Sequence, residues 1–124
     1  MPEVITLLGC PAAIKTFENL AYQADVEVNG KMSYTATVIT PDGEASYTIW
    51  YSPKGQAPVE ELGVFILSPK EKVGSAGGEG FTYVSVEEDT SDPTKAVLQW
   101  LAPGEDGDFM NQENMECVEA KIAQ

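Results

Sequence analysis

The chain of 124 residues contains no histidine and no arginine. Without histidine it lacks the one side chain that titrates near neutral pH when unperturbed, an imidazole metal ligand and any His-dependent catalytic triad. Without arginine it lacks the guanidinium fork that grips a phosphate or a carboxylate through two parallel hydrogen bonds. These absences exclude Ser-His-Asp hydrolase and ordinary phosphoryl-transfer designs within this chain, and we expect a protein that is not an enzyme.

Positive charge is scarce throughout. Seven lysines stand against 20 Asp and Glu, which gives a formal net charge of -13 at pH 7. Nucleic-acid binding draws most of its affinity from cations that displace the counterions around phosphates, so this chain should repel nucleic acids and anionic membranes. We expect a basic protein partner, no direct nucleic-acid contact and no membrane contact.

Long apolar runs are also missing. The runs Val4–Leu8 and Val64–Leu67 fall far short of the roughly 20 residues that a membrane-spanning helix needs. No basic residue precedes Lys15, so the first residues lack the positive charge of a secretory signal. We expect a cytoplasmic or virion-associated protein, and a mature secreted chain stays open as an alternative.

The chain has only two cysteines, Cys10 and Cys117. In an oxidising compartment a disulfide between them would close a loop across nearly the whole chain. In a reducing compartment they are small buried hydrophobic side chains, which is the interpretation we favour. Neither has a second cysteine nearby in sequence, so the usual zinc and redox motifs are absent, and we expect no metal and no cofactor.

The apolar content, 43%, is enough to fill one core, and the length predicts a single domain over residues 1–124. Val4–Leu8 predicts a buried strand. Pro11 is favourable at a first helical position, and the spacing of the apolar residues Ile14, Phe17 and Leu20 predicts a helix over 11–23.

After this segment the apolar period changes to two, which is the period of a strand. We predict a meander of three strands over 25–52. Asn29-Gly30 is a strong signal for a two-residue hairpin turn, and Pro41-Asp42-Gly43 predicts the second turn.

The rest of the chain predicts further strands and the loops between them. Strands are expected at 64–67, 81–86 and 96–101, with loops over 52–58 and 70–80. Residues 111–122 fit a helix or a strand.

These elements favour an α+β fold. We expect a twisted antiparallel sheet of five or six strands, rolled toward a partial barrel, with one N-terminal helix packed on it. The alternative is an all-β sandwich or barrel in which the 11–23 helix is a minor crossover.

Two acidic clusters are the first candidate site. They comprise Glu87, Glu88, Asp89 and Asp92, and Glu105, Asp106 and Asp108. Loop carboxylates are also the usual calcium ligands, but neither cluster has the ligand spacing of an EF-hand. We interpret them as a charged surface that contacts a basic partner.

The neighbouring aromatic residues Trp50 and Tyr51 are the second candidate. Strand alternation places them on opposite faces, so we expect one of the two rings to be exposed. An exposed ring suits an interface anchor or a platform on which a sugar stacks.

The function expected from these features is a non-enzymatic interaction or assembly module that docks on a basic protein surface. Its composition suits a small viral structural or accessory protein, and a DNA-mimicking inhibitor belongs to the same class because carboxylates can take the place of phosphates. The alternative is a small-ligand or carbohydrate-binding β-rich domain that uses exposed Trp or Tyr rings.

Overall fold

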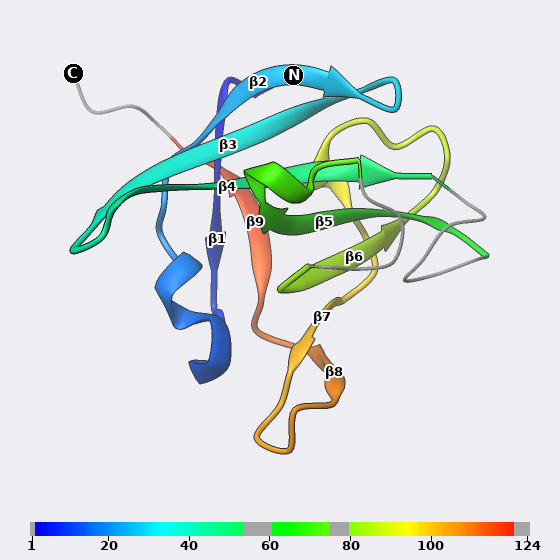
Figure 1. The fold of residues 1–124 in the computed structure, drawn as a ribbon. Coiled ribbons are helices and arrows are strands. Elements are labelled where there is room, and N and C mark those ends of the chain that lie inside the picture. The colour runs from blue at the N-terminus through cyan, green and yellow to red at the C-terminus, as the bar shows by residue number, and fades with distance from the viewer. Residues whose placement is uncertain (1, 54–60, 75–79, 121–124) are drawn as a thin grey trace.

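The computed structural model describes residues 2–53, 61–74 and 80–120. These residues form one antiparallel sheet of nine strands (Figure 1). The strands are β1 (Val4–Leu8), β2 (Tyr22–Val28), β3 (Lys31–Thr40), β4 (Gly43–Ser52), β5 (Gly63–Pro69), β6 (Thr82–Val86), β7 (Trp100–Pro103), β8 (Phe109–Gln112) and β9 (Glu116–Glu119). The helical elements of the described residues are three short 3₁₀ helices: η1 (Ala12–Phe17), η2 (Lys70–Lys72) and η3 (Pro93–Lys95).

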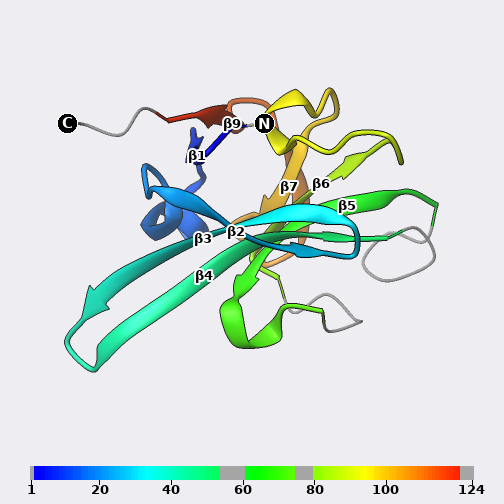
Figure 2. The same cartoon turned by 90° about the horizontal axis from the view of Figure 1, so that it is seen from above.

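The sheet is a meander whose last strand returns to the first. The order β8-β7-β6-β5-β4-β3-β2-β1-β9 makes β8 and β9 the two edges. Yet only residues 113–115 separate these edge strands in sequence, and so short a stretch of chain spans at most about 14 Å. The sheet must therefore curl until its edges approach each other, which gives the half-barrel seen in Figures 1 and 2.

Met115 and Gly9 lie where the 113–115 connection packs against the rest of the sheet. Met115 is buried, and its sulfur accepts a hydrogen bond from the Thr82 hydroxyl at 3.8 Å. Gly9, just after β1, packs so closely on the 113–115 connection that a Cβ there would lie 1.8 Å from the Asn114 carbonyl oxygen. Its φ of +70° is also one that side-chain-bearing residues avoid.

The apolar runs and the period-two pattern together predicted most of the strands correctly. The meander over 25–52 is confirmed as β2, β3 and β4, and the strands expected at 4–8, 64–67 and 81–86 are also present. The first hairpin turns at Asn29 and Gly30, whose φ angles of +55° and +86° are those that a type I′ turn requires.

The helix predicted over 11–23 is wrong, and the α+β fold class is wrong with it. The segment forms only η1, whose regularity is broken at Ile14 (φ -127°, ψ 23°). Glu18 is already extended, and Asn19 has a φ of +63°. The fold is nearly all β, and the predicted all-β alternative describes it better.

Tertiary packing explains why the apolar stripe of this segment forms no helix. Phe17 inserts between Tyr47 and Phe81, with ring centroids at 4.9 and 4.6 Å. The Tyr22 hydroxyl donates to the Phe17 carbonyl at 2.8 Å, at the point where the chain enters β2. An irregular turn buries Ile14 and Phe17 without a regular helix, and it lets β2 begin within the predicted helix.

Other predictions need smaller corrections. The sheet has nine strands where we expected five or six. Two of the additional strands, β8 and β9, form in or beside the segment that fitted a helix or a strand. The strand expected at 96–101 begins only at Trp100. The loops expected over 52–58 and 70–80 fall partly on residues 54–60 and 75–79, which lie outside the described residues. None of the described helices has the length and apolarity needed to cross a membrane.

The main core fills the inner face of the curled sheet. Its fully buried side chains are mostly aromatic and branched residues: Ile5, Leu7, Tyr22, Tyr34, Ile49, Phe65, Leu67 and Val84. The opposite face carries a small second cluster of Trp50, Val64 and Ile66. Both faces of the central strands are therefore covered.

The β3–β4 hairpin extends beyond the rest of the sheet (Figure 2). The two strands pair with each other as far as Thr40↔Gly43, whereas β2 pairs with β3 only as far as Thr35, and β5 pairs with β4 only as far as Tyr47. We call residues 36–46 the arm.

Candidate functional site

The acidic residues predicted to contact a partner lie in two separate groups, at opposite ends of β7. Residues 87–89 are exposed in the connection that follows β6, whereas Glu105, Asp106 and Asp108 are exposed in the turn between β7 and β8. The structure therefore does not join the two clusters into one surface.

Asp92 acts within the first cluster as a helix cap. Its carboxylate accepts hydrogen bonds from the backbone N–H and the hydroxyl of Thr94, at 2.9 and 2.7 Å, and so begins η3. Such capping stabilises the first helical turn by about 1 kcal/mol. This carboxylate is half-buried and already bonded, so we assign it a structural role.

Lys31 fixes the first cluster to the sheet, a contact that the sequence analysis missed. Its ammonium donates to the carbonyl oxygens of Glu88 and Thr90, at 2.6 and 2.5 Å, and lies 4.5 Å from the centroid of the Tyr51 ring. Burial lowers the pKa of this buried lysine, and the nearby Asp89 and Glu88 charges act in the opposite direction. Lys31 thus links the β2–β3 turn to the acidic connection.

The expectation that Trp50 or Tyr51 is exposed is wrong, because both rings are buried, at 2% and 4% exposure. Trp50 lies in the second cluster, where its indole N–H donates to the Ser68 hydroxyl at 2.8 Å. Tyr51 lies in the main core against Phe65. Strand alternation does place the two rings on opposite faces of the sheet, but each ring is buried there by other side chains.

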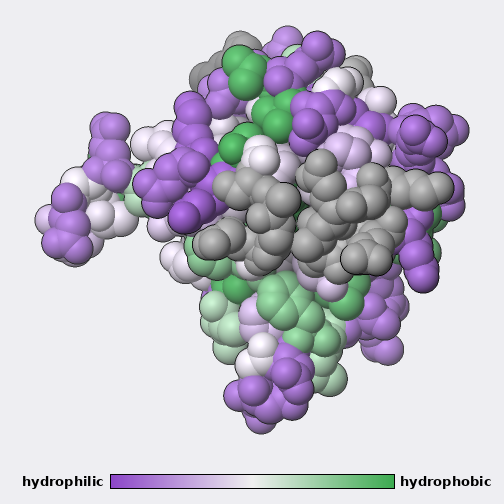
Figure 3. All heavy atoms as spheres, turned by 45° about the vertical axis from the view of Figure 1, so that its right-hand side comes forward, coloured by the Kyte–Doolittle hydropathy of each residue, from purple (hydrophilic) through white to green (hydrophobic). Residues whose placement is uncertain are grey.

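An exposed apolar surface that the sequence analysis also missed lies on the outer face of β6–β8. We call it the β8 patch; it consists of Tyr83, Val97, Leu98, Leu101 and Phe109. Val97 is 90% and Phe109 40% exposed. The rings of Tyr83 and Phe109 stack with centroids 5.5 Å apart. Figure 3 shows hydrophobic side chains gathered over β7 and β8, next to the hydrophilic tip of their turn.

A groove runs along the other side of β8. It has a volume of about 650 Å³ and lies between Pro11–Ala13 and the β7–β8 hairpin. Met110, which is 54% exposed, lines it together with Glu105 and Asp106. We call this hollow the β8 groove. Phe109 and Met110 are adjacent in a strand, so they serve opposite faces: Phe109 the β8 patch and Met110 the β8 groove.

The strand between these two surfaces is an open edge. Among the described residues β8 pairs only with β7, from Trp100↔Gln112 to Pro103↔Phe109. The strand itself, residues 109–112, carries no charge. Edge strands present unpaired backbone donors and acceptors to which an extended segment can add.

The acidic turn is held in place beside this edge by its own backbone. The Gly104 N–H donates to the Asp108 carbonyl at 2.8 Å, and the Gly107 N–H donates to the Gly104 carbonyl at 3.0 Å. The Asp106 carboxylate accepts from the Asp108 N–H at 3.2 Å. Three carboxylates therefore stand at a defined end of β8, where a basic side chain of an added strand would meet them.

The two thiols lie away from this surface. Cys10 and Cys117 are free and buried. Burial, together with the Glu18 charge, raises the pKa of Cys10 to about 11 from its ordinary 9.0. Burial together with the Asp92 charge raises the pKa of Cys117 to about 12.

We predict that both thiols resist alkylation in the folded protein and react after unfolding. The rise of the Cys10 pKa alone lowers its thiolate fraction about 100-fold near pH 8. The unfolded thiols ionise above about pH 9, so the free energy of unfolding should fall as the pH rises from there through 11 to 12. Iodoacetamide labelling read by mass spectrometry, with and without denaturant, checks the first point. Fast labelling of the native protein would contradict it.

The described residues offer no grouping of three or more Cys, Asp or Glu side chains that could hold a metal ion. Comparison with known proteins adds nothing to this surface: no family model, no curated protein and no solved structure matches the chain. The β8 patch, the β8 groove and the acidic turn are therefore the features of the molecule that suggest a function.

Proposed function

We propose that this protein is a non-enzymatic interaction or assembly module that binds an extended segment of a basic protein partner along β8. The observation that carries the proposal is the exposed pair Phe109 and Met110 on an open edge strand that ends beside three carboxylates. An extended segment with apolar and basic side chains complements the exposed apolar pair, the open strand edge and the three carboxylates.

Each feature supplies a different part of the binding free energy. Burial of a Phe or Met side chain contributes about 1.5 to 3 kcal/mol when complete. Each backbone hydrogen bond to the edge adds about 0.5 to 1.5 kcal/mol. The carboxylates at Glu105, Asp106 and Asp108 speed the encounter with a basic segment and select its orientation. Together these contributions suit a weak to moderate complex with defined polarity.

Within this class, the composition supports a small viral structural or accessory component that acts in the cytoplasm or in a virion. A DNA-mimicking inhibitor has less support. Mimicry of a phosphate backbone needs an ordered row of carboxylates, whereas the two acidic clusters lie at opposite ends of β7.

We do not propose the alternative of carbohydrate binding. It required exposed Trp or Tyr rings, but Trp50, Tyr51 and Trp100 are 2%, 4% and 3% exposed. The exposed ring of the β8 patch, Phe109, is already stacked on Tyr83.

A peptide about ten residues long, with valines through its middle so that both faces of the added strand are apolar and lysines at both ends, tests the proposal by isothermal titration calorimetry. We expect a Kd of roughly 10 to 100 µM at low salt, weakening as ionic strength rises because the carboxylates are solvent-exposed. Replacing both Phe109 and Met110 by serine should weaken binding at least about tenfold through the lost apolar contact. The triple change Glu105→Gln, Asp106→Asn and Asp108→Asn should remove most of the salt dependence.

Matched controls distinguish binding at β8 from nonspecific binding of the peptide elsewhere on the protein. Val26→Ser removes an apolar side chain that is 60% exposed on β2, remote from β8, and should leave binding unchanged. A peptide with glutamate in place of lysine should not bind. Equal binding of the two peptides, or full binding by the Phe109/Met110 double variant, would rule out the proposal.

A further inference from the structure

The β8 groove is apolar along most of its lining and anionic where it meets the acidic turn. The carboxylates come from Glu105 and Asp106, and no lysine is among the described residues that line the groove. A ligand that complements this lining has a long apolar body and a cation at its tip. The apolar lining consists of small or flexible side chains: Pro11, Ala12, Ala13, Pro103 and Met110.

The Met110 side chain and the Asp106 carboxylate adjoin at Gly104. A Cβ on Gly104 would lie 2.7 Å from the Met110 sulfur and 3.6 Å from an Asp106 carboxylate oxygen. Met110 is also largely exposed, so the part of its side chain that does not pack on Gly104 is open to a ligand. One side chain of a partner can therefore contact the apolar lining and the carboxylate together.

Both carboxylates of the groove are available to a cation. Neither Glu105 nor Asp106 forms an ion pair with a described residue. Asp106 uses one oxygen to accept from the Asp108 N–H at 3.2 Å, which leaves its second oxygen. The net charge of -13 also favours any cation that approaches the protein.

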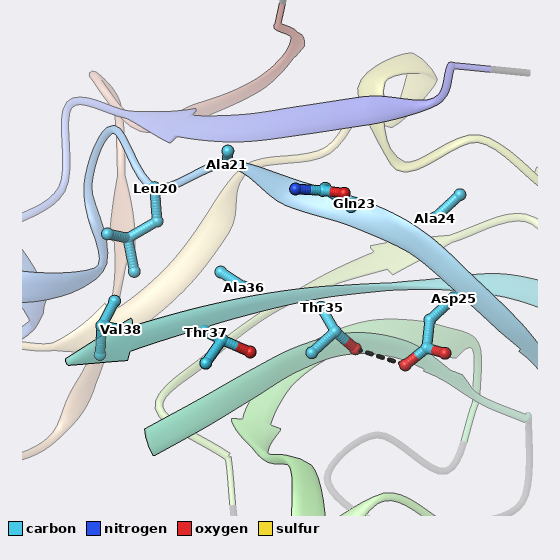
Figure 4. Close-up of a pocket in the computed structure, with 9 residues that line it drawn as sticks. All are labelled: Leu20, Ala21, Gln23, Ala24, Asp25, Thr35, Ala36, Thr37 and Val38. Carbon is cyan, nitrogen blue, oxygen red and sulfur yellow. Dashed lines mark hydrogen bonds between the residues drawn. The ribbon is translucent and has the colours of Figure 1, made fainter. Parts of the chain in front are cut away.

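A second groove, at the base of the arm, differs in this respect (Figure 4). It has a volume of about 350 Å³ and lies where β2 leaves β3, with residues 20–25 along one side and 35–38 along the other. Its carboxylate, Asp25, is occupied, because it accepts from the Thr35 hydroxyl at 2.9 Å and pairs with Lys70 at 3.3 Å. Of these two grooves, the β8 groove is therefore the better site for an external cation.

We propose that the β8 groove receives a lysine side chain of the partner segment, with the aliphatic stem on Met110 and the ammonium beside Glu105 and Asp106. This assignment rests on the proposed function, which brings the segment to β8, and it identifies a residue that the segment must carry. Lysine buries its stem on apolar surface while its ammonium stays in water, as these exposed carboxylates require. An ammonium can bond single oxygens of two carboxylates, whereas a guanidinium fork uses both oxygens of one.

Butylammonium is the lysine side chain without its backbone, and it tests the groove without a peptide. NMR of isotope-labelled methionine methyl groups distinguishes the exposed Met110 from the buried Met115 and the partly buried Met32. We expect a saturable shift of the Met110 methyl alone, with a Kd on the order of 10 mM. Butanol has the same carbon chain without the charge, so it should bind at least about threefold more weakly.

Two double variants with equal changes of charge locate the cation. Glu105→Gln with Asp106→Asn should weaken butylammonium binding to the level of butanol. Glu87→Gln with Glu88→Gln removes the same charge from exposed residues at the other end of β7 and should leave the Met110 shift unchanged. Equal shifts with butanol and butylammonium, or equal effects of the two double variants, would overturn the assignment.

Gly104→Ala tests the contact between the apolar lining and the carboxylate. Gly104 is not among the glycines with positive φ, so alanine there brings no backbone strain and displaces only the flexible end of Met110. The added methyl group occupies the position where the stem and the ammonium meet. We expect butylammonium binding to weaken at least about threefold, because the stem loses its contact with Met110.

The peptide of the proposed function carries the same test to a whole segment. Diaminobutyrate in place of each lysine keeps the charge at about pH 6 but shortens the stem. This peptide should bind at least about threefold more weakly than the lysine peptide, because less of the stem is buried. Equal binding of the two peptides would contradict a groove that holds the stem.

The two proposals can fail separately. Peptide binding at β8 with no Met110 shift by butylammonium would overturn the lysine groove and leave strand addition in place. A saturable, charge-dependent Met110 shift with no peptide binding would support the groove as a lysine site and overturn strand addition along β8.

Discussion

Replacing Gly9 by alanine is expected to lower the free energy of unfolding by about 3 kcal/mol, a large part of the roughly 5 to 15 kcal/mol that stabilises a typical domain. Two costs add at this position. A side chain at a φ of +70° costs about 1 to 2 kcal/mol, and forcing backbone apart in a packed region costs about 1 to 3 kcal/mol. The second cost arises because the new Cβ would overlap the Asn114 carbonyl oxygen, at 1.8 Å. Urea denaturation followed by tryptophan fluorescence measures the loss.

Gly107→Ala is the matched control for this prediction. Gly107 has a φ of +86°, and a Cβ there would meet nothing within 4 Å. It therefore carries only the backbone cost, about 1 to 2 kcal/mol. If both variants lost the same stability, the close approach of Gly9 to the 113–115 connection would not be what makes glycine necessary there.

Replacing Lys31 by methionine is expected to lower the free energy of unfolding by about 2 kcal/mol and to loosen residues 87–92. Methionine keeps most of the apolar stem, but it removes the donor that serves the Glu88 and Thr90 carbonyls. Hydrogen bonds from a charged group contribute about 1.5 to 3 kcal/mol, and the contact with the Tyr51 ring adds to them. Denaturation measures the global loss, and amide hydrogen exchange measures the local one.

Lys70→Met removes the same charge at a solvent-exposed position. Lys70 pairs with Asp25 at 3.3 Å, but its side chain is 57% exposed, and ion pairs of this kind contribute less than about 1 kcal/mol. We expect little change in stability and none in the exchange of residues 87–92. Unchanged exchange in the Lys31 variant would show that the acidic connection is ordered by other contacts.

The sequence predicted strands well where a two-residue period continued over several residues. From Asp25 to Ser52 the alternation and the Asn29-Gly30 turn agree with each other, and the structure follows both. The helix prediction for 11–23 was wrong because apolar residues at spacings of three and four indicate only that one side of the chain is buried. They do not require that the backbone be helical. Phe17 is buried through contacts with Tyr47 and Phe81, which are distant in sequence, and no local pattern reports those contacts.

The candidate site could be predicted only in part. Acidic turns are visible in a sequence, so Glu105, Asp106 and Asp108 were found before the structure. The prediction that Trp50 or Tyr51 is exposed was wrong because it assumed that one face of the strand meets solvent, whereas side chains cover both faces of β4. The sequence could have pointed to Phe109 and Met110, because they are two apolar residues directly after an acidic turn. That they stay exposed depends on β8 being the last strand in the meander, a property of the whole fold.

The return of β9 to β1 also constrains how this chain reaches its native state. The pairs from Ile5↔Glu119 to Leu8↔Glu116 join residues more than 100 positions apart. During synthesis β1 can acquire its second neighbour only after the more than 100 residues that lead to β9 have left the ribosome, so β1 waits long for this partner. Contacts this distant in sequence slow folding and prolong the exposure of unpaired strands to aggregation. Efficient production of this protein should therefore depend on conditions that protect its nascent N-terminal segment.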